Sequence, residues 1–228
     1  MDRAAIRSQV RLVTLLETQS VTDTQINTLI NQGLHEVEVY TDWRFLKDHD
    51  DLDVVAGTQG YSLATLTNST FNRAIALVDD DIDRSVDYIP ASEFYHRYGR
   101  DTGNSGARAR IWTIDAGSIL LHPTPSANDT ARYRLHYYKT MTELSADGTS
   151  PEFHQGFHWL LVDFCKWKLW EREEYFDEAR NAQQDFYRKL DEMEKWYARV
   201  TREDPWIYGD GRYLKTYRDP NLPILDGA

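Results

Sequence analysis

Two histidines are the residues whose type and spacing come nearest to a chemical site. His154 and His158 are four positions apart, and on a helix this spacing would place both rings on one face, where they could share a metal ion. The residues between them lack the glutamate that acts as the base in the helical zinc-protease motif, and a third ligand has no evident place. Surface or partly buried histidines are therefore the favoured interpretation. A metal-dependent hydrolase that uses this pair is the alternative.

Three aspartates show the spacing of the first ligands in a calcium-binding loop. Asp79, Asp81 and Asp83 would be its first, third and fifth residues. Arg84, however, stands where the loop requires glycine, and Pro90 stands where it requires a bidentate acid. We therefore interpret these residues as a turn with solvated carboxylates.

Other catalytic fingerprints are missing from the sequence. It contains no Walker pattern, no GxGxxG and no Gly-x-Ser-x-Gly elbow. The single cysteine, Cys165, stands among aromatic residues, so we expect a buried, unreactive thiol and no disulfide. We therefore expect no catalytic residues, no metal and no cofactor, and a scaffold or interaction protein rather than an enzyme.

The stretch that would position the histidines and the cysteine is residues 151–200. Ser150 and Pro151 form a typical helix start, with a capping serine before a proline at the first helical position. Two apolar stripes at helical spacing then predict two long helices, joined by a tight turn at residues 175–177 with Asp177 as a cap. The stripes are Phe153, Phe157, Leu160, Phe164 and Trp167, followed by Ala179, Ala182, Phe186, Leu190, Met193, Tyr197 and Val200. Further apolar residues surround the first helix, which should therefore lie centrally in the core.

Two more helices are predicted near the N-terminus. Residues 3–17 carry a narrow apolar stripe, and Thr22 opens a capping box from which a second helix runs to about Tyr40. The first helix also has a stripe of arginines, formed by Arg3, Arg7 and Arg11. We interpret this stripe as a face that pairs with acidic neighbours, and a subunit interface or a DNA channel is the alternative.

The period of the apolar residues changes between residues 48 and 148. Alternating patterns bounded by turn residues predict short strands at residues 52–55, 61–66, 71–78, 110–114, 119–122 and 131–139. A short helix is expected over residues 92–98, and the loop of residues 100–107, rich in Gly, Asn and Ser, should be mobile. The strands would form a small antiparallel sheet inserted between two pairs of helices.

The stretch beyond Thr201 has no helical period. Its aromatic residues and prolines are scattered among Gly, Asp and Arg, whereas a disordered tail would be poor in aromatic residues. We therefore expect an extended arm that docks on its own domain or on another subunit. The residues of this arm that we expect to contact a partner are Trp206, Tyr208, Tyr213, Tyr217, Pro220, Leu222, Pro223 and Ile224.

The fold class that follows is α+β. We expect a helical bundle of about four helices with an inserted small antiparallel β-sheet and an extended C-terminal arm. The corresponding domains are residues 1–47 together with 150–201, residues 48–149, and residues 202–228. The length of 228 residues fits one large domain or one domain with an insertion.

Composition and charge exclude several classes of protein. A formal net charge of -11 argues against a surface that grips nucleic acid through clustered Lys and Arg. The sequence contains no run of about 18 apolar residues, so we expect no membrane span. The first residues lack the apolar region of a signal peptide. The seven Trp and fourteen Tyr suit protein–protein interfaces.

Several short segments follow one another along the chain in an order that is typical of one known family. They are residues 40–45 (YTDWRF), 88–95 (YIPASEFY), 109–114 (ARIWTI), 119–125 (ILLHPTP) and 133–138 (YRLHYY), followed by the long helical hairpin and the arm. In this order and composition the chain resembles the head-to-tail adaptor (connector) proteins of tailed bacteriophages.

This resemblance implies a structural virion protein at the head–tail junction, assembled in the cytoplasm of the bacterial host. It implies a homo-oligomeric ring, dodecameric in relatives, that docks under the portal protein and binds tail or nozzle proteins. The ring would extend the channel through which double-stranded DNA passes without sequence specificity. The C-terminal arm would reach the portal or a neighbouring subunit. Another virion completion or tail component, or a helical interaction module, is the alternative.

Overall fold

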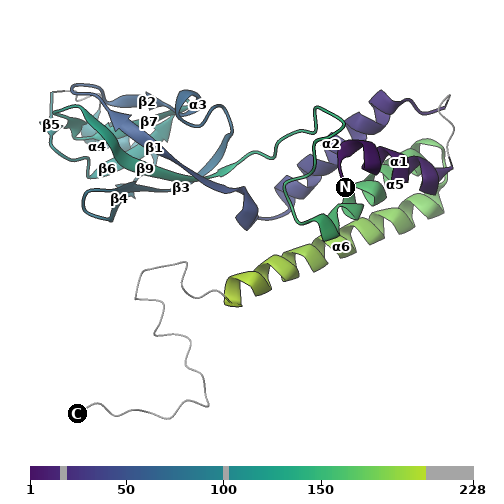
Figure 1. Ribbon diagram of the computed structural model, residues 1–228. Helices are drawn as coiled ribbons and strands as arrows, with labels where there is room; N and C mark the ends of the chain where they lie inside the picture. Colours follow the sequence, from purple (N-terminus) through teal and green to yellow (C-terminus); the bar gives the residue numbers. More distant parts are fainter. Residues whose placement is uncertain (16–19, 100–102, 204–228) are drawn as a thin grey trace, which may run out of the picture.

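The structure is a computed structural model that describes residues 1–15, 20–99 and 103–203. Figure 1 shows a helical half and a sheet half side by side along one long axis. The α-helices are α1 (Arg3–Thr14), α2 (Asp23–Tyr40), α3 (Leu63–Leu66), α4 (Ala91–Tyr98), α5 (Trp159–Arg172) and α6 (Phe176–Glu203), with two short 3-10 helices, η1 (Arg44–Leu46) and η2 (Gln155–Phe157). The strands are β1 (Lys47–Val54), β2 (Gly60–Ser62), β3 (Phe71–Asp79), β4 (Arg84–Tyr88), β5 (Ser105–Gly106), β6 (Ile111–Asp115), β7 (Ser118–His122), β8 (Thr124–Pro125) and β9 (Asp129–Lys139).

Helix α5 lies at the centre of the helical half, where it packs against α1, α2 and α6. Its central place follows from its sequence, because it buries apolar residues on most of its circumference and would otherwise expose some of them to water. The capping box at Thr22 is present at the start of α2, as predicted. Helix α1 ends at Thr14, followed by Leu15 in the left-handed conformation, so it is shorter than predicted; Leu16 lies outside the described residues.

A glycine allows α2 to approach α5 closely. Gly33 is buried inside α2, where glycine normally costs helix stability. A Cβ atom at this position would lie 3.0 Å from the Phe164 ring and 3.1 Å from a methyl group of Leu161. The missing side chain is therefore what makes room for the aromatic ring of α5.

Helix α5 does not begin at Pro151, as its sequence suggests. Residues 151–158 instead form an irregular segment with η2, and α5 starts at Trp159. Long-range contacts explain the difference: Phe153 is buried in the core, and the Tyr197 hydroxyl of α6 accepts a hydrogen bond from the backbone N–H of His154 (3.0 Å). The turn between α5 and α6 consists of residues 173–175, and Asp177 lies inside the first turn of α6 rather than before it.

The sheet is larger than expected and is not purely antiparallel. Seven strands follow the order β1-β9-β3-β4-β6-β7-β2, and all neighbours are antiparallel except β4 and β6. Strands β5 and β8 form a separate parallel pair. In β9 the predicted alternation is confirmed, because Tyr133, Leu135 and Tyr137 are buried on one face.

Three details of the sheet half differ from the prediction. Residues 61–66 are not one strand, because β2 ends at Ser62, whose side chain caps the short helix α3. With α3 and α4 the described residues contain six α-helices rather than about four, so the fold is mixed α and β. The loop expected at residues 100–107 contains β5, where Gly106 would bring a Cβ atom to 2.7 Å from Pro123; residues 100–102 lie outside the described residues.

Each half has a hydrophobic core of its own. One is built by α1, α2, α5 and α6 together with Trp43, Leu46 and Phe153, and the other by the strands of the seven-stranded sheet. Figure 1 shows that the chain crosses between the halves twice, once after α2 and once after β9. The domain boundaries proposed above remain a prediction. Among the described helices, none combines the length and the apolar character that a membrane span requires.

Candidate interaction surfaces

The two histidines do not form a shared metal site. Because α5 begins after them, they lack the helical spacing that the metal hypothesis required. The His154 Nδ1 accepts from the backbone N–H of Gly156 (3.2 Å). The His158 Nε2–H donates to the Phe153 carbonyl (3.0 Å), its Nδ1 lies 2.6 Å from the amino group of Met1, and burial lowers its pKa. Both rings are thus used to hold the segment before α5.

Two of the three aspartates pair with an arginine instead of a metal ion. The Nη2 of Arg132, a buried residue of β9, lies 3.0 Å from Asp79, and its Nη1 pairs with Asp81. Asp83 follows in the turn between β3 and β4, with a positive φ of 50°. The ion pairs therefore fix this turn to β9. The prediction that all these carboxylates are solvated is wrong for Asp79, which is buried at the end of β3 and paired with Arg132.

No other group of ligands gathers in the part of the chain that the structure describes. There, no three His, Cys, Asp or Glu residues lie together in a way that could hold a metal ion. Cys165 is buried, and burial raises the pKa of its thiol, so the reactive thiolate is disfavoured. These residues offer structure rather than reactivity.

The arginine stripe of α1 binds acidic residues of its own chain. Arg3 and Arg7 share the carboxylate of Asp147, at 2.8 and 3.0 Å. Arg7 also lies 3.4 Å from Asp23 at the start of α2, and Arg11 pairs with the same carboxylate. The stripe thus joins α1 to α2 and to the segment after β9. This arrangement favours the interpretation of an ion-paired face, and the subunit-interface or channel role remains a prediction.

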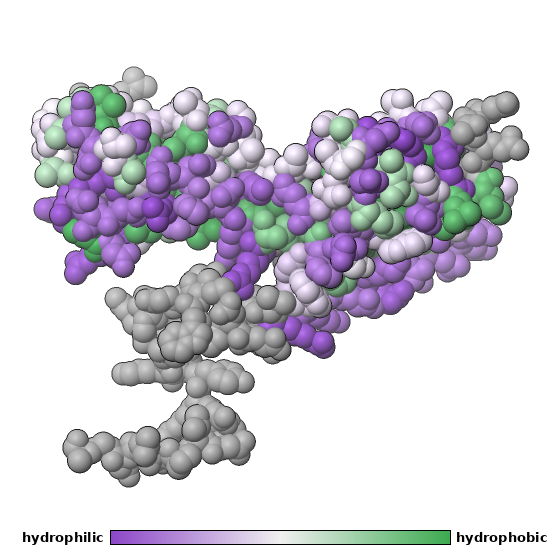
Figure 2. Space-filling view, viewed as in Figure 1, coloured by the Kyte–Doolittle hydropathy of each residue, from purple (hydrophilic) through white to green (hydrophobic). Residues whose placement is uncertain are grey.

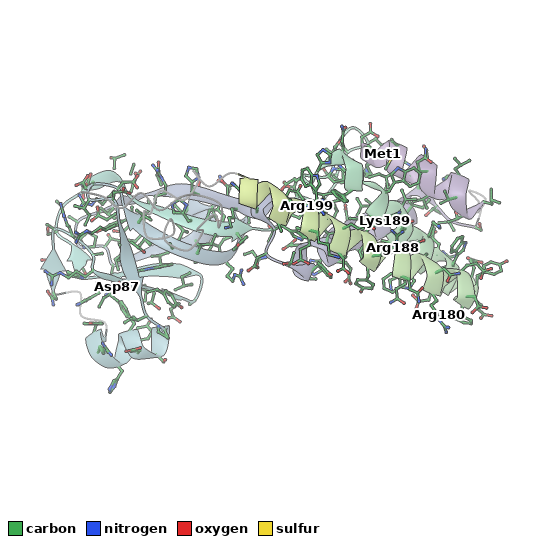
Figure 3. All side chains as sticks on the ribbon, turned by 90° about the horizontal axis from the view of Figure 1, so that it is seen from below. Met1, Asp87, Arg180, Arg188, Lys189 and Arg199 are labelled. Carbon is green, nitrogen blue, oxygen red and sulfur yellow. The ribbon has the colours of Figure 1, made fainter. Side chains whose placement is uncertain are left out.

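An aromatic cluster, which we call the joint, lies where the chain crosses between the halves. It consists of Trp43, Phe45, Phe153 and Tyr197. The Phe45 ring centroid lies 5.1 Å from that of Tyr197 and 5.6 Å from that of Trp43. The joint connects the exit of α2 with the last turns of α6, so it fixes the direction of α6 relative to the first crossing. Figure 3 shows α6, with Arg180, Arg188 and Arg199 along it, running toward the sheet half, and in Figure 1 its last turns lie below this crossing.

A second aromatic surface lies on the sheet, and we call it the β3 groove. It has a volume of about 460 Å³ and is lined by residues 71–75 of β3 together with Tyr88, Trp112 and Ile114. Ile75 is 45 % exposed and Tyr88 is 54 % exposed. In the described structure these apolar side chains therefore remain partly exposed to solvent, whereas the arginines of α1 described above are paired within the chain. The groove has no signature in the sequence, because it depends on how three strands are paired.

Exposed apolar residues also lie at the tip of the helical half. Figure 1 places the end of α1 and the start of α6 together at the tip that points away from the sheet, and Figure 2 shows apolar surface there. The exposed residues of these ends are Leu12, Leu15, Tyr175 and Phe176. Patches of this kind are typical of protein–protein contacts.

The comparison with known protein families agrees with an interaction protein. The family described as SU10 adaptor protein, a phage head–tail adaptor family, matches residues 1–209. The chain belongs to the SU10 adaptor protein family. A search of curated proteins found no match. Membership covers both halves described above, so the SU10 adaptor fold includes the sheet as well as the helices, and its role is that of a structural phage adaptor.

The proposed contact residues of the C-terminal arm lie outside the described residues. They are Trp206, Tyr208, Tyr213, Tyr217, Pro220, Leu222, Pro223 and Ile224. The match to the SU10 adaptor family ends at residue 209, so it includes Trp206 and Tyr208 but not the six residues that follow. The contacts of the arm therefore remain a prediction.

Proposed function

We propose that this SU10 adaptor forms a homo-oligomeric ring under the portal of a tailed phage, where it extends the DNA channel and attaches the tail. The observation that carries this proposal is the family match over residues 1–209. As a phage adaptor, the protein is a virion component with portal and tail proteins as partners. The ring, its dodecameric stoichiometry and its assembly in the host cytoplasm are part of the proposal.

The distribution of exposed apolar surface supports a ring. A closed ring of identical subunits uses heterologous contacts, in which one surface of a subunit meets a different surface of the next. This chain offers two separate apolar surfaces, the tip of the helical half and the β3 groove. The C-terminal arm, with Trp206 and Tyr208 near its start, would add a third contact with the portal or a neighbouring subunit.

The charge of the chain suits a DNA channel. With a net charge of -11, a ring of such subunits would be strongly acidic. An acidic wall repels phosphate groups, so double-stranded DNA can pass without being held. Arg3, Arg7 and Arg11 do not oppose this effect, because their guanidinium groups are paired with Asp23 and Asp147.

The experiment that tests the proposal uses the full-length protein and purified portal. We expect the adaptor to bind the portal ring, to add one copy per portal subunit by native mass spectrometry, and to be present in purified virions. Absence from virions, together with failure to bind the portal, would contradict the proposal. The mass of the isolated adaptor does not decide the matter, since ring formation can require the portal.

A further inference from the structure

The seven-stranded sheet is split beside β3. On one side, β9 pairs with β3 along its whole length. On the other side, β4 pairs with β3 only at residues 77–79 and then turns away to pair with β6 at residues 87–88. Within the described ranges no strand covers this side of residues 71–76. An open strand edge of this kind presents unpaired N–H and C=O groups and is a template for another strand.

The β3 groove occupies this split. Side chains of a strand alternate between its two faces, so a cavity over one face would be lined by every second residue. The groove is instead lined by the five consecutive residues 71–75, because register shifts against β9 after Phe71 and after Ala74 interrupt the alternation here. The same stretch has no strand partner on its other side, so the open edge of β3 runs along the groove. The opposite wall is formed by Tyr88, Trp112 and Ile114, and the Tyr88 and Trp112 rings pack edge to face at 5.1 Å. The groove thus combines a hydrogen-bonding edge with apolar and aromatic side chains, as sites for strand addition do.

We propose that residues 212–217 of a neighbouring copy of this chain add to the open edge of β3 as an extra strand. This segment, Arg-Tyr-Leu-Lys-Thr-Tyr, is as long as the open edge and lies in the stretch between Pro205 and Pro220, where no proline interrupts a strand. Tyr and Thr favour strands. The alternation of the segment places Tyr213 and Tyr217 on one face, where they suit the aromatic wall of the groove.

Charge and reach fit the same occupant. Residues 212–218 carry three basic side chains, and Asp87 and Asp115 stand next to the groove residues Tyr88 and Ile114 in the sequence. Helix α6 ends at Glu203, on the side of the helical half that faces the sheet half and below the crossing between them (Figure 1). The eight residues from 204 to 211 can span up to roughly 27 Å when extended. The segment can therefore leave its own subunit.

The choice of a neighbouring copy rests on the proposed function. A heterologous ring contact requires two different surfaces on one chain, and a strand together with an open edge provides such a pair. Each subunit would donate its segment to the next and receive one from the previous subunit. A strand of its own chain, or one from the portal or a tail protein, is the outcome that the tests below separate from this proposal.

Disulfide cross-linking tests the added strand directly. Cys165 is the one native cysteine and is buried, so cross-links report engineered positions. Full-length Ile75→Cys protein is mixed, under mild oxidation and with or without portal, with full-length proteins that carry one cysteine at each position from 213 to 217. Because strand side chains alternate, we expect the heterodimer yield to alternate with a period of two residues, by about tenfold between faces.

Control variants define the results that would contradict strand addition. Leu12 is 65 % exposed, more than Ile75 at 45 %, but it lies on the helical tip, so Leu12→Cys should give only background cross-linking with the same partners. Yields without alternation along residues 213–217, or equal yields with Leu12→Cys, would overturn the proposal. Ile75→Asp combined with Tyr88→Ser should disfavour strand addition, and circular dichroism should confirm that the variant is folded, because Ile75 is 45 % exposed and the Tyr88 ring packs on Trp112. When Ala74→Cys is added to that double variant, its cross-linking to the single cysteines at positions 213 to 217 should be lost.

A double variant identifies the source of the strand. Ile75→Cys with Lys215→Cys, a position on the same face of the segment as Tyr213 and Tyr217, in one full-length chain should give a ladder of oligomers on a denaturing gel if the strand comes from a neighbour. An internally cross-linked monomer alone would show that the chain fills its own groove, and it would overturn the proposal. If the adaptor binds the portal and enters virions but shows no alternating cross-links, this inference fails and the proposed function stands. Alternating cross-links in a protein that does not bind the portal would support this inference and contradict the proposed function.

Discussion

Phe164 shows how one side chain can hold several helices together. Its ring is 2 % exposed, lies against Gly33 of α2, and packs against Phe186 of α6 with a centroid distance of 5.4 Å. It therefore contributes to the contacts of α5 with two neighbouring helices. Removing it would leave a cavity that these helices cannot easily close.

We expect Phe164→Ala to lower the free energy of unfolding by about 3–5 kcal/mol, as for a buried aromatic residue. Trp159→Ala is the control, because it removes a large aromatic side chain from the same helix at an exposed position. Denaturant unfolding followed by circular dichroism would measure both variants. A loss below about 1 kcal/mol for Phe164→Ala would mean that the core of the helical half is wrongly placed.

Asp147 provides a pH-dependent contact between α1 and the segment after β9. Hydrogen bonds from Arg7 and Arg3 lower the pKa of its carboxyl from 3.8 to about 2. A carboxyl with a lower pKa in the folded state stabilises that state at pH values above 3.8, and this contribution is lost as the pH falls toward 2. We therefore expect Asp147→Asn to destabilise the protein at neutral pH, with an effect that shrinks as the pH falls through about 2 and vanishes below it.

Unfolding curves of the two proteins across this pH range would test the expectation. Asp87→Asn, which changes an exposed carboxylate in the sheet half, is the control and should show no such dependence. A destabilisation by Asp147→Asn that is equal at neutral pH and near pH 2 would show that Arg3 and Arg7 do not hold the carboxylate as described.

At the scale of elements, local signals predicted most of the helices. The capping box at Thr22, the stripe of α6 and the short helix α4 before Gly99 depend on residues close in sequence, and each is present. The predicted start of α5 at Pro151 was wrong. The signal of Ser150 followed by Pro151 is local, whereas a hydrogen bond to Tyr197 in α6 holds residue 154 outside the helix. Tertiary contacts thus override a local start signal.

The strands were located more easily than they were paired. Alternation placed β3, β6, β7 and β9 within a few residues of their observed bounds. The pairing of β1 with β9, more than seventy residues away, and the parallel contact of β4 with β6 have no signature in a single sequence. For the same reason the β3 groove could not be predicted, although two of the strands that line it, at residues 71–78 and 110–114, were. The metal hypothesis for His154 and His158 lost its basis, the helical spacing, only when the start of α5 at Trp159 was known.

Gly33→Ala tests the close approach of α2 and α5. Replacing glycine by alanine inside a helix normally stabilises it by about 1 kcal/mol. Here the new methyl group would meet Phe164 and Leu161 at 3.0–3.1 Å, so we expect a net destabilisation of about 1–3 kcal/mol from overpacking. Gly148→Ala is the control, since nothing lies within 4 Å of its Cβ position. A thermal unfolding temperature of Gly33→Ala above that of the unchanged protein would contradict this packing.

At the scale of the whole molecule, folding and assembly should be separable. Among the residues that the structure describes, those of both hydrophobic cores lie before position 198. We therefore expect a protein truncated after Thr201 to keep its circular dichroism spectrum and unfolding temperature but to lose assembly on the portal. Co-sedimentation with portal rings would measure the loss. Unfolding of the truncated protein would instead identify the arm as an intramolecular strap.

A finer variant distinguishes the two parts of the arm. Trp206→Ala with Tyr208→Ala changes the arm within the region that matches the SU10 adaptor family, whereas Tyr213→Ala with Tyr217→Ala changes it beyond that region. We expect both pairs to weaken portal assembly and neither to alter folding. Full assembly by both variants would show that these side chains do not anchor the arm.

The place where the sheet half joins the helical half has a consequence for how such proteins diversify. Lys47 at the start of β1 and Tyr138 near the end of β9 are paired residues, so the inserted part of the chain enters and leaves at neighbouring points. In antiparallel strands such partners lie about 5 Å apart. A short peptide could therefore bridge them, and the whole sheet could be exchanged for another module without disturbing the helices. Evolution can in this way change the partner that the sheet recognises while it keeps the helical framework.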